Sequence, residues 1–298
     1  QEVQKIMIHC YRMGICRKKN ENGYWQHRKR KKKMTLYCKE NAGSKDVSGR
    51  YLWEGTMKIS VAMAYYNGGE YIEEQLSSIL AQLGAEDEVV VSVDAASDGS
   101  GEILEQRARE DSRIRLLTGP SKGVVKNFEN AITHCAGDII FLSDQDDIWK
   151  DGKVEKVIKA FRRSGVMAVL HNAEIINEKG QKTEELTLFE MRNSRSGLLK
   201  NFLKNSYMGC CMAFRRELLP VLIPIPEQMY MHDYWIGTAA ELCGGVGLLK
   251  EPLIGYRRHG GNVTDLSHRG IWFMLKKRMN ILRCLGILKK RIKNMERL

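Results

Sequence analysis

The stretch GDIIFLSDQDDIW, residues 137–149, decides how the rest of the chain is interpreted. A short apolar run is followed at once by three carboxylates in four residues, which is typical of a buried strand that ends at a polar edge. Similar runs occur at 59–64, 88–93, 114–117 and 166–170, and amphipathic segments separate them at 70–83, 101–109, 124–134 and 154–163. Strands that alternate with helices of this length predict an α/β fold with a mostly parallel sheet covered on both faces.

The second half of the chain is less regular. We expect a strand at 207–214, a helix at 230–242 and two short strands at 246–249 and 253–257. Apolar residues set among Lys and Arg over about 270–298 predict a basic amphipathic helix or a pair of helices.

The positive charge divides the chain into three parts. The net charge is +12 overall, but it is +9 over residues 1–56, −6 over 57–265 and +9 over 266–298. We therefore expect a basic, poorly ordered N-terminal extension (1–56), a catalytic domain (57–265) and a basic helical tail (266–298). Because the regular pattern begins just after Met57, we take Met57 as a candidate natural start.

Cysteine usage and hydropathy indicate the compartment. The eight cysteines form no CxxC pair, so they resemble neither a zinc site nor a disulfide framework and favour a reduced compartment. We see no apolar core of a signal peptide and no apolar run of about 18 residues that would span a membrane. The expected location is the cytoplasm.

The acidic cluster of Asp144, Asp146 and Asp147 is the first candidate site. Carboxylates so close together repel one another unless a cation lies among them. Mg²⁺ and Mn²⁺ prefer carboxylate and phosphate oxygens, so a metal held here can also grip a diphosphate. The alternative is a solvated acidic turn that caps the helix after it.

Other polar residues follow predicted strands, and each has an ordinary alternative. Asp94 ends the second strand, where it can accept hydrogen bonds from a base or ribose, and Asn67 lies in a Tyr-Asn-Gly-Gly turn that lets a ligand approach the backbone. Asp233 opens a predicted helix, as a general base or as an N-cap residue. Arg257 and His259 lie in a basic, glycine-rich loop suited to phosphate or metal contacts.

Taken in order, these motifs carry a family resemblance. The segments KISVAMAYYNGGEYIEEQ, VDAASDGS, GPSKGVVKNFENAI, GDIIFLSDQDDIW, GCCMAFRREL, HDYW and EPLIGYRRHGGNV resemble the family 2 glycosyltransferases of the GT-A fold over about residues 57–265. The chain is most similar to bacterial rhamnosyltransferase-like members that build surface polysaccharides. It departs from the family at Val93-Asp94-Ala95, where two aspartates and a glycine are usual.

The resemblance implies a role for particular residues. Asp233 would be the catalytic base, and Asp146 and His259 would hold Mn²⁺ or Mg²⁺. The nucleotide sugar would be bound by the following residues: Tyr65, Asn67, Asp94, Lys126, Asp144, Gln145 and Arg257.

The implied reaction is an inverting displacement. Asp233 would take the proton of an acceptor hydroxyl while the metal neutralises the departing diphosphate. The expected partners are a nucleotide-diphosphate sugar, a saccharide or lipid-linked acceptor and, through the basic tail, an anionic membrane surface at the inner face of the plasma membrane. The alternative for the tail is packing on the domain or dimerisation.

Three alternatives remain open, and one is a non-catalytic relative of the same family, although the Asp pair and Asp233 are both present. A nucleotidyltransferase that makes a nucleotide sugar shares the fold and the metal, but it would carry a basic glycine-rich loop after its first strand, and residues 65–71 contain no Lys or Arg. A nucleic-acid-binding protein would explain the basic ends but not the acidic centre or the absence of a binding module, so we expect no nucleic-acid partner.

Overall fold

The computed structural model describes residues 16–19, 25–27, 57–94, 98, 100–162, 165–259 and 271–297. The chain forms two compact units, Gln1–Asn41 and Ala42–Leu298. In the first unit, β1 (Cys16–Lys19) pairs antiparallel with β2 (Trp25–His27), two short strands that the sequence pattern did not indicate. The remainder of residues 1–56, for which we predicted poor order, lies outside the described residues.

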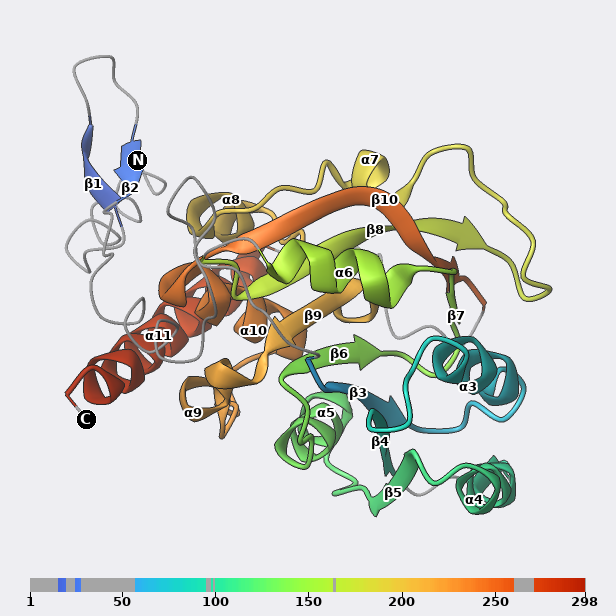
Figure 1. Ribbon diagram of the computed structural model, residues 1–298. Coiled ribbons are helices and arrows are strands. Elements are labelled where there is room, and N and C mark those ends of the chain that lie inside the picture. Colours follow the sequence, from blue (N-terminus) through green and yellow to red (C-terminus); the bar gives the residue numbers. More distant parts are fainter. Residues whose placement is uncertain are drawn as a thin grey trace, which may run out of the picture. The chain divides into compact units, whose positions relative to one another are not determined.

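The second unit is built on an eight-stranded sheet (Figure 1). In spatial order its strands are β5 (Ile114–Thr118), β4 (Glu88–Val93), β3 (Ile59–Tyr65), β6 (Ile139–Ser143), β9 (Met212–Arg215), β8 (Ala168–Ile176), β10 (Val246–Arg257) and β7 (Ile148–Trp149). Neighbouring strands from β5 to β6 are parallel, and so are β8 and β10. Only β9 and β7 run against their neighbours, so the predicted α/β fold with a mostly parallel sheet is confirmed.

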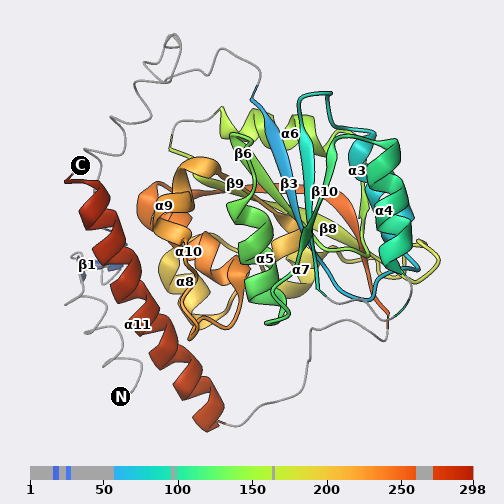
Figure 2. The ribbon, with the colours of Figure 1, turned by 90° about the horizontal axis from the view of Figure 1, so that it is seen from below.

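Helices cover both faces of this sheet. The described helices of this unit are α3 (Ile72–Leu80), α4 (Ser100–Glu110), α5 (Val124–Thr133), α6 (Lys153–Phe161), α7 (Leu188–Arg192), α8 (Leu198–Leu203), α9 (Leu219–Leu222), α10 (His232–Cys243) and α11 (Ile271–Met295), with 3₁₀ turns η1 (Gly209–Cys211) and η2 (Arg216–Leu218). Of these, α8, α9 and α11 pack mainly on other helices and turns. Figures 1 and 2 show α5 across the sheet from α3 and α4, and α10 across it from α6. From β3 the chain adds β4 and then β5 on one side, and α5 then carries it back along the other face of the sheet to β6, on the other side of β3. The strand order therefore reverses between β3 and β6.

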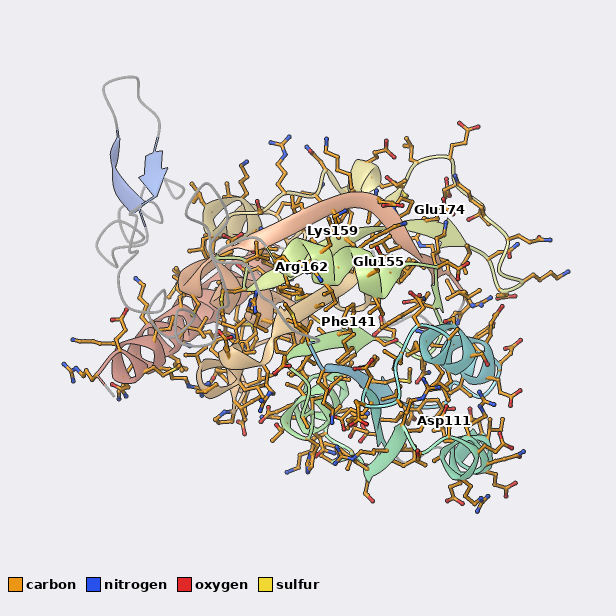
Figure 3. All side chains as sticks on the ribbon, viewed as in Figure 1. Asp111, Phe141, Glu155, Lys159, Arg162 and Glu174 are labelled. Carbon is orange, nitrogen blue, oxygen red and sulfur yellow. The ribbon has the colours of Figure 1, made fainter. Side chains whose placement is uncertain are left out.

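Double coverage explains the composition of the central strands. All five residues of β6 are buried, as are six of the seven residues of β3, because strands covered on both faces are apolar throughout rather than alternating. Phe141 lies inside at the middle of β6, whereas Glu155 and Lys159 lie on the outer face of α6 (Figure 3). The core thus supports the β3 and β6 ends, where the acidic cluster begins.

Two elements of the second half differ from the pattern. The strands expected at 246–249 and 253–257 are one strand, β10, whose register against β8 shifts on either side of Pro252. The strand expected from residue 207 begins at Met212, after the turn η1.

The C-terminal helix α11 packs on α9 and α10. One face of α11 carries Ile281, Cys284, Leu285 and Leu288, all buried and spaced as one side of a helix requires. The side chain of Arg291 also donates hydrogen bonds of 2.8–3.1 Å to backbone carbonyls at the end of α9. None of the described helices combines the length and hydropathy needed to cross a bilayer.

Candidate active site

The site lies where the carboxyl ends of β3 and β6 meet. In a doubly wound sheet, ligands bind at this reversal of strand order. The Gln145 side chain joins the two strand ends, since it accepts a hydrogen bond from the Tyr66 backbone N–H (2.7 Å) and donates one to the Tyr66 carbonyl (2.8 Å). A Cβ at position 68 would lie 2.4 Å from the Gln145 side chain, so any residue other than glycine there would displace Gln145. The loop after β3 is therefore held beside the acidic cluster.

Side chains of the kinds that can hold a metal ion gather at the end of β6. Asp144, Asp147 and Cys210 each present a ligand atom, and these atoms lie within 4.8 Å of one another. The neighbouring Asp146 carboxylate lies 2.8 Å from Nε2 of His259, which is 113 residues away in the sequence. The structure thus brings together the two residues that the sequence predicted as metal ligands.

Burial and mutual repulsion raise the pKa values of the carboxyls in this cluster. The pKa of the Asp144 carboxyl is raised to about 7, mainly by burial and then by the charges of Asp146 and Asp233. The Asp144 residue itself is half-buried. The pKa of Asp147 is also raised, by burial and then by Asp146 and Asp144. A buried ammonium, that of Lys153, lies beneath the cluster with its Nζ 3.7 Å from the centre of the Trp149 ring. Burial lowers the pKa of Lys153 to about 8.

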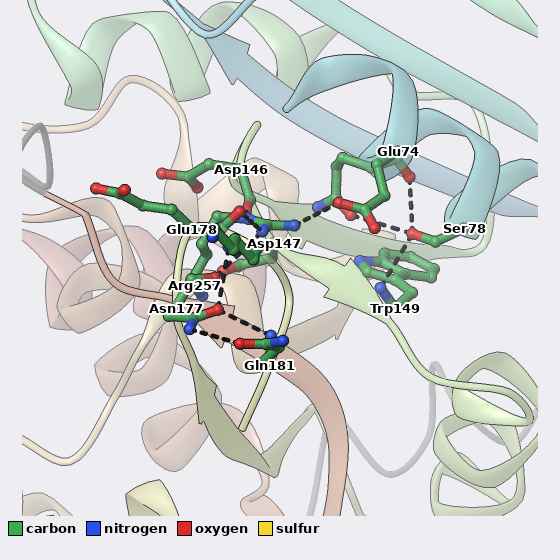
Figure 4. A network of polar contacts seen from close by, with 11 residues as sticks. Glu74, Ser78, Asp146, Asp147, Trp149, Asn177, Glu178, Gln181 and Arg257 are labelled. Atoms are coloured by element: carbon green, nitrogen blue, oxygen red, sulfur yellow. Dashed lines mark hydrogen bonds and ion pairs between the residues drawn. The ribbon is translucent and has the colours of Figure 1, made fainter. Parts of the chain in front are cut away.

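Arg257 holds the acidic loop in place (Figure 4). It is 1% exposed, and its guanidinium is surrounded by oxygen acceptors. Its backbone N–H donates to the Asp147 carboxylate (3.1 Å) and its Nε donates to the Asp146 carbonyl (2.8 Å). The remaining guanidinium nitrogens donate to the carbonyls of Asn177 and Glu178 and to the carboxylate of Glu74.

The second buried carboxylate of the site is Asp233. It is 5% exposed in the first turn of α10, a helix whose residues 232–240 are all buried. The alternative role as an N-cap is wrong, because Met231 occupies that position and the Asp233 carboxylate accepts hydrogen bonds from the N–H groups of Tyr234 and Gly209. Burial raises its pKa to about 6, and the Tyr234 hydrogen bond and nearby cations oppose this rise.

A comparison with protein families settles the relationship. The model of glycosyl transferase family 2 matches residues 60–222, which is more than half of the chain. The chain belongs to glycosyl transferase family 2. This match begins at β3 and ends with α9, so it includes the acidic cluster of the family 2 domain, while Asp233 and His259 lie beyond it.

Curated relatives of this family 2 chain come from several bacteria. An uncharacterized glycosyltransferase of Nostoc sp. is 27% identical over 214 residues, which is 69% of this chain and 66% of that protein. The Escherichia coli enzyme WfgD, named UDP-Glc:alpha-D-GlcNAc-diphosphoundecaprenol beta-1,3-glucosyltransferase, is 35% identical over 60% of this chain and 67% of its own length. The chain spans only 60–66% of the first relatives it matches, in Nostoc and Mycobacterium.

Solved structures confirm the GT-A fold of this family 2 chain. S. aureus TarS 1-349 in complex with UDP-GlcNAc superposes with a TM-score of 0.58 at 17% identity, covering 79% of this chain and 72% of that one. The Pyrobaculum calidifontis mannosyltransferase PcManGT, in complex with GDP-Man and Mn²⁺, gives a TM-score of 0.51 at 17% identity and covers 80% and 75%. At these identities the likeness establishes the fold.

Three of the residues predicted to bind the nucleotide sugar, Tyr65, Asn67 and Asp94, lie at or just after the ends of β3 and β4, whereas Arg257 ends β10. Tyr65 is fully buried and its hydroxyl accepts the Gly68 N–H (3.1 Å), while Asn67 is exposed with φ of 48°. The Asp94 carboxylate accepts the N–H of Ser121 (2.7 Å). Their contacts with a nucleotide stay predictions.

Lys126 is placed differently from the others. Its ammonium contacts Glu129 (2.7 Å) and the Ile225 carbonyl (3.0 Å), so in this structure it ties α5 to the segment before α10. Its predicted contact with the donor stays a prediction too.

Several residues of the site were missed by the sequence interpretation. Tyr66, rather than Tyr65, is exposed (59%) at the β3 end, and Cys210 and Lys153 lie close to the acidic cluster. The adjacent tyrosines and the GCC motif were the only signals, and neither tells which side chain points outward. Arg192 and Lys277 act by charge on Asp233 and had no signal at all.

Proposed function

We propose that this chain is an inverting, metal-dependent glycosyltransferase that moves a sugar from a nucleoside-diphosphate donor to a hydroxyl of a saccharide or lipid-linked acceptor. One observation carries the proposal. The charges of Asp146, on the acidic loop, and of Asp233, on α10, both act on the Asp144 carboxyl. The predicted metal ligand and the predicted base therefore act on the same carboxyl, although 87 residues separate them in the sequence.

The donor side is supported by the neighbours. TarS is described with UDP-GlcNAc and PcManGT with GDP-Man, so nucleotide sugars are the natural donors to test. A dTDP-rhamnose donor follows from the rhamnosyltransferase-like resemblance, and a UDP-hexose is the second choice. The names of WfgD and of Bacillus subtilis TuaG, a putative teichuronic acid biosynthesis glycosyltransferase, favour a place in surface-polysaccharide synthesis.

The residues present fit a divalent metal. Asp146 and His259 would hold it with Asp144 beside them, and carboxylates whose pKa values are raised by burial and mutual repulsion gain from a cation. Oxygen-rich ligands with one imidazole suit Mn²⁺ or Mg²⁺. Bound there, the ion would supply Lewis-acid stabilisation of the leaving diphosphate.

Asp233 provides the base. As the acceptor oxygen bonds to the anomeric carbon, its proton passes to the Asp233 carboxylate and the bond from that carbon to the diphosphate oxygen breaks. A pKa of about 6 leaves the carboxylate ionised at neutral pH and more basic than an exposed aspartate. The backbone N–H groups of Tyr234 and Gly209 fix its direction.

A donor screen tests the proposal. We expect Mn²⁺-dependent release of sugar from one of the dTDP-, UDP- or GDP-sugars, with turnover reduced about 10²–10⁴-fold in Asp233→Asn and unchanged in Asp151→Asn, an exposed control carboxylate. Donor binding should survive in Asp233→Asn. Full turnover in that variant, or no release from any donor class, would contradict the proposal.

We also propose that the protein works at the inner face of the plasma membrane, in peripheral contact with anionic lipid. The outer face of α11 carries exposed Lys276, Arg283 and Lys290 at seven-residue spacing, opposite its buried face. Each basic residue near an anionic surface contributes about 1 kcal/mol. Replacing all three with Gln should abolish sedimentation with phosphatidylglycerol vesicles at low salt; unchanged sedimentation would refute the contact.

A further inference from the structure

The C-terminal helix α11 brings a cation close to the start of α10, where Asp233 lies. Nζ of Lys277, in the first half of α11, lies 3.7 Å from the centre of the Tyr230 ring. Tyr230 precedes α10 by two residues, and its ring lies 5.5 Å from that of Tyr234, next to Asp233. The Tyr230 ring thus holds the Lys277 ammonium near the N-terminus of α10.

A second cation near Asp233 comes from another element, and its charge acts on the Asp233 carboxyl. Arg192 is the last residue of α7, which packs on β8, and it is half-buried. Arg192 and Lys277 both lower the pKa of Asp233 by their charge, whereas the hydrogen bonds to its carboxylate come from backbone N–H groups. Two elements that are distant in the sequence therefore place positive charge around the base.

The position of Lys277 is fixed by packing. Cys284, Leu285 and Leu288 are buried in the middle of α11, which packs on α9 and α10. Farther along the helix, Arg291 donates hydrogen bonds to carbonyls at the end of α9. A side chain that only attracts a membrane needs no such placement. A cation on a rigid helix next to a catalytic base is suited to recognising a defined anionic group.

We propose that Arg192 and Lys277 bind a phosphate or diphosphate carried by the acceptor, and that α11 is therefore part of the acceptor site. The inference rests on the proposed function and names the acceptor class as a phosphate-linked saccharide. A neutral sugar hydroxyl would need no cation here, whereas a phosphate group with up to two negative charges matches two cations. The Tyr230 ring offers an apolar surface for the group beside the phosphate.

Binding of decyl diphosphate tests the proposal without requiring transfer. With UDP and Mn²⁺ saturating the donor side, isothermal titration should show that Lys277→Gln and Arg192→Gln each weaken its binding by roughly fivefold to tenfold. Lys277→Arg should bind like the unchanged protein. Lys276→Gln, which removes an exposed charge next to it on α11, is the matched control and should have no effect.

Two controls distinguish binding of the acceptor phosphate from binding of the alkyl chain and from binding of an anionic membrane. They are decyl maltoside and phosphatidylglycerol vesicles. Neither Gln variant should alter the binding of decyl maltoside, a neutral amphiphile of the same chain length, or sedimentation with phosphatidylglycerol vesicles. Unchanged decyl diphosphate binding in the two variants, an equal loss in Lys276→Gln, or an equal loss of vesicle binding would each overturn the inference. Failure of the unchanged protein to use any donor would contradict the proposed function instead, because these binding results stand without turnover.

Discussion

Replacing Asp233 with Asn should stabilise the protein at neutral pH while removing most of its activity. The carboxyl is 5% exposed, and burial raises its pKa from the ordinary 3.8 to about 6. The difference between these two values corresponds to about 3 kcal/mol of unfolding free energy that the ionised carboxylate costs the folded state. An asparagine keeps an oxygen for the N–H groups of Tyr234 and Gly209 and carries no charge.

The sign of this effect depends on pH. Because the folded protein binds the Asp233 proton more tightly than the unfolded chain, this group contributes its full stability below pH 3.8, and the contribution is lost as the pH rises through about 6. The variant and the unchanged protein should therefore be similar in stability near pH 4. The advantage of the variant should grow to at most about 3 kcal/mol above pH 6.

Urea unfolding at several pH values, with donor turnover measured in parallel, checks both halves of the prediction. Comparing the two proteins at each pH removes the contribution of other titrating groups, including most of that from Asp144. A variant that is less stable than the unchanged protein at pH 8 would refute the reasoning about burial. The rate of the unchanged protein should fall below about pH 6, as the base becomes protonated.

Three further substitutions test other parts of the structure. Asp146→Ala should lose donor binding and its Mn²⁺ dependence together in titration calorimetry, unlike the exposed control Asp151→Ala; an unchanged donor affinity with Mn²⁺ would overturn the metal assignment. Arg257→Lys should lower the urea-unfolding free energy by about 2–4 kcal/mol because it loses several buried hydrogen bonds, whereas a similar loss for the exposed Arg258→Lys would contradict this cause. Gly286→Ala, in α11 with open space around it, should raise that free energy by about 0.5–1 kcal/mol, and a decrease would argue against the helix.

Strands buried on both faces were predictable, and strands defined by distant partners were not. The apolar runs of β3, β4 and β6 reflect double coverage by helices, so their bounds are found within a residue or two. The two-residue strand β7 exists because Ile148 and Trp149 pair with the far end of β10. Pro252 interrupts the pattern of β10, yet the strand continues because β8 still provides a partner and the register shift absorbs the missing N–H.

The chemistry of the site was easier to predict than its surroundings. The carboxylates of the acidic loop are conspicuous because charge directly after a buried strand has few ordinary explanations. The contact between Asp146 and His259 depends on the end of β10 pairing with β7, the strand directly after the acidic loop, and only a family resemblance could suggest it. Lys153 and Cys210 look like an ordinary helix start and an ordinary core residue, so their place beneath the acids depends on packing that no local pattern encodes.

A crystal structure of the Asp233→Asn variant with a nucleotide sugar and Mn²⁺ is the most direct measurement. The account predicts that the ion contacts Asp146 and the diphosphate, and that the anomeric carbon lies between that diphosphate and the side chain at position 233. A donor whose sugar points away from α10, or an ion bound far from the end of β6, would contradict it.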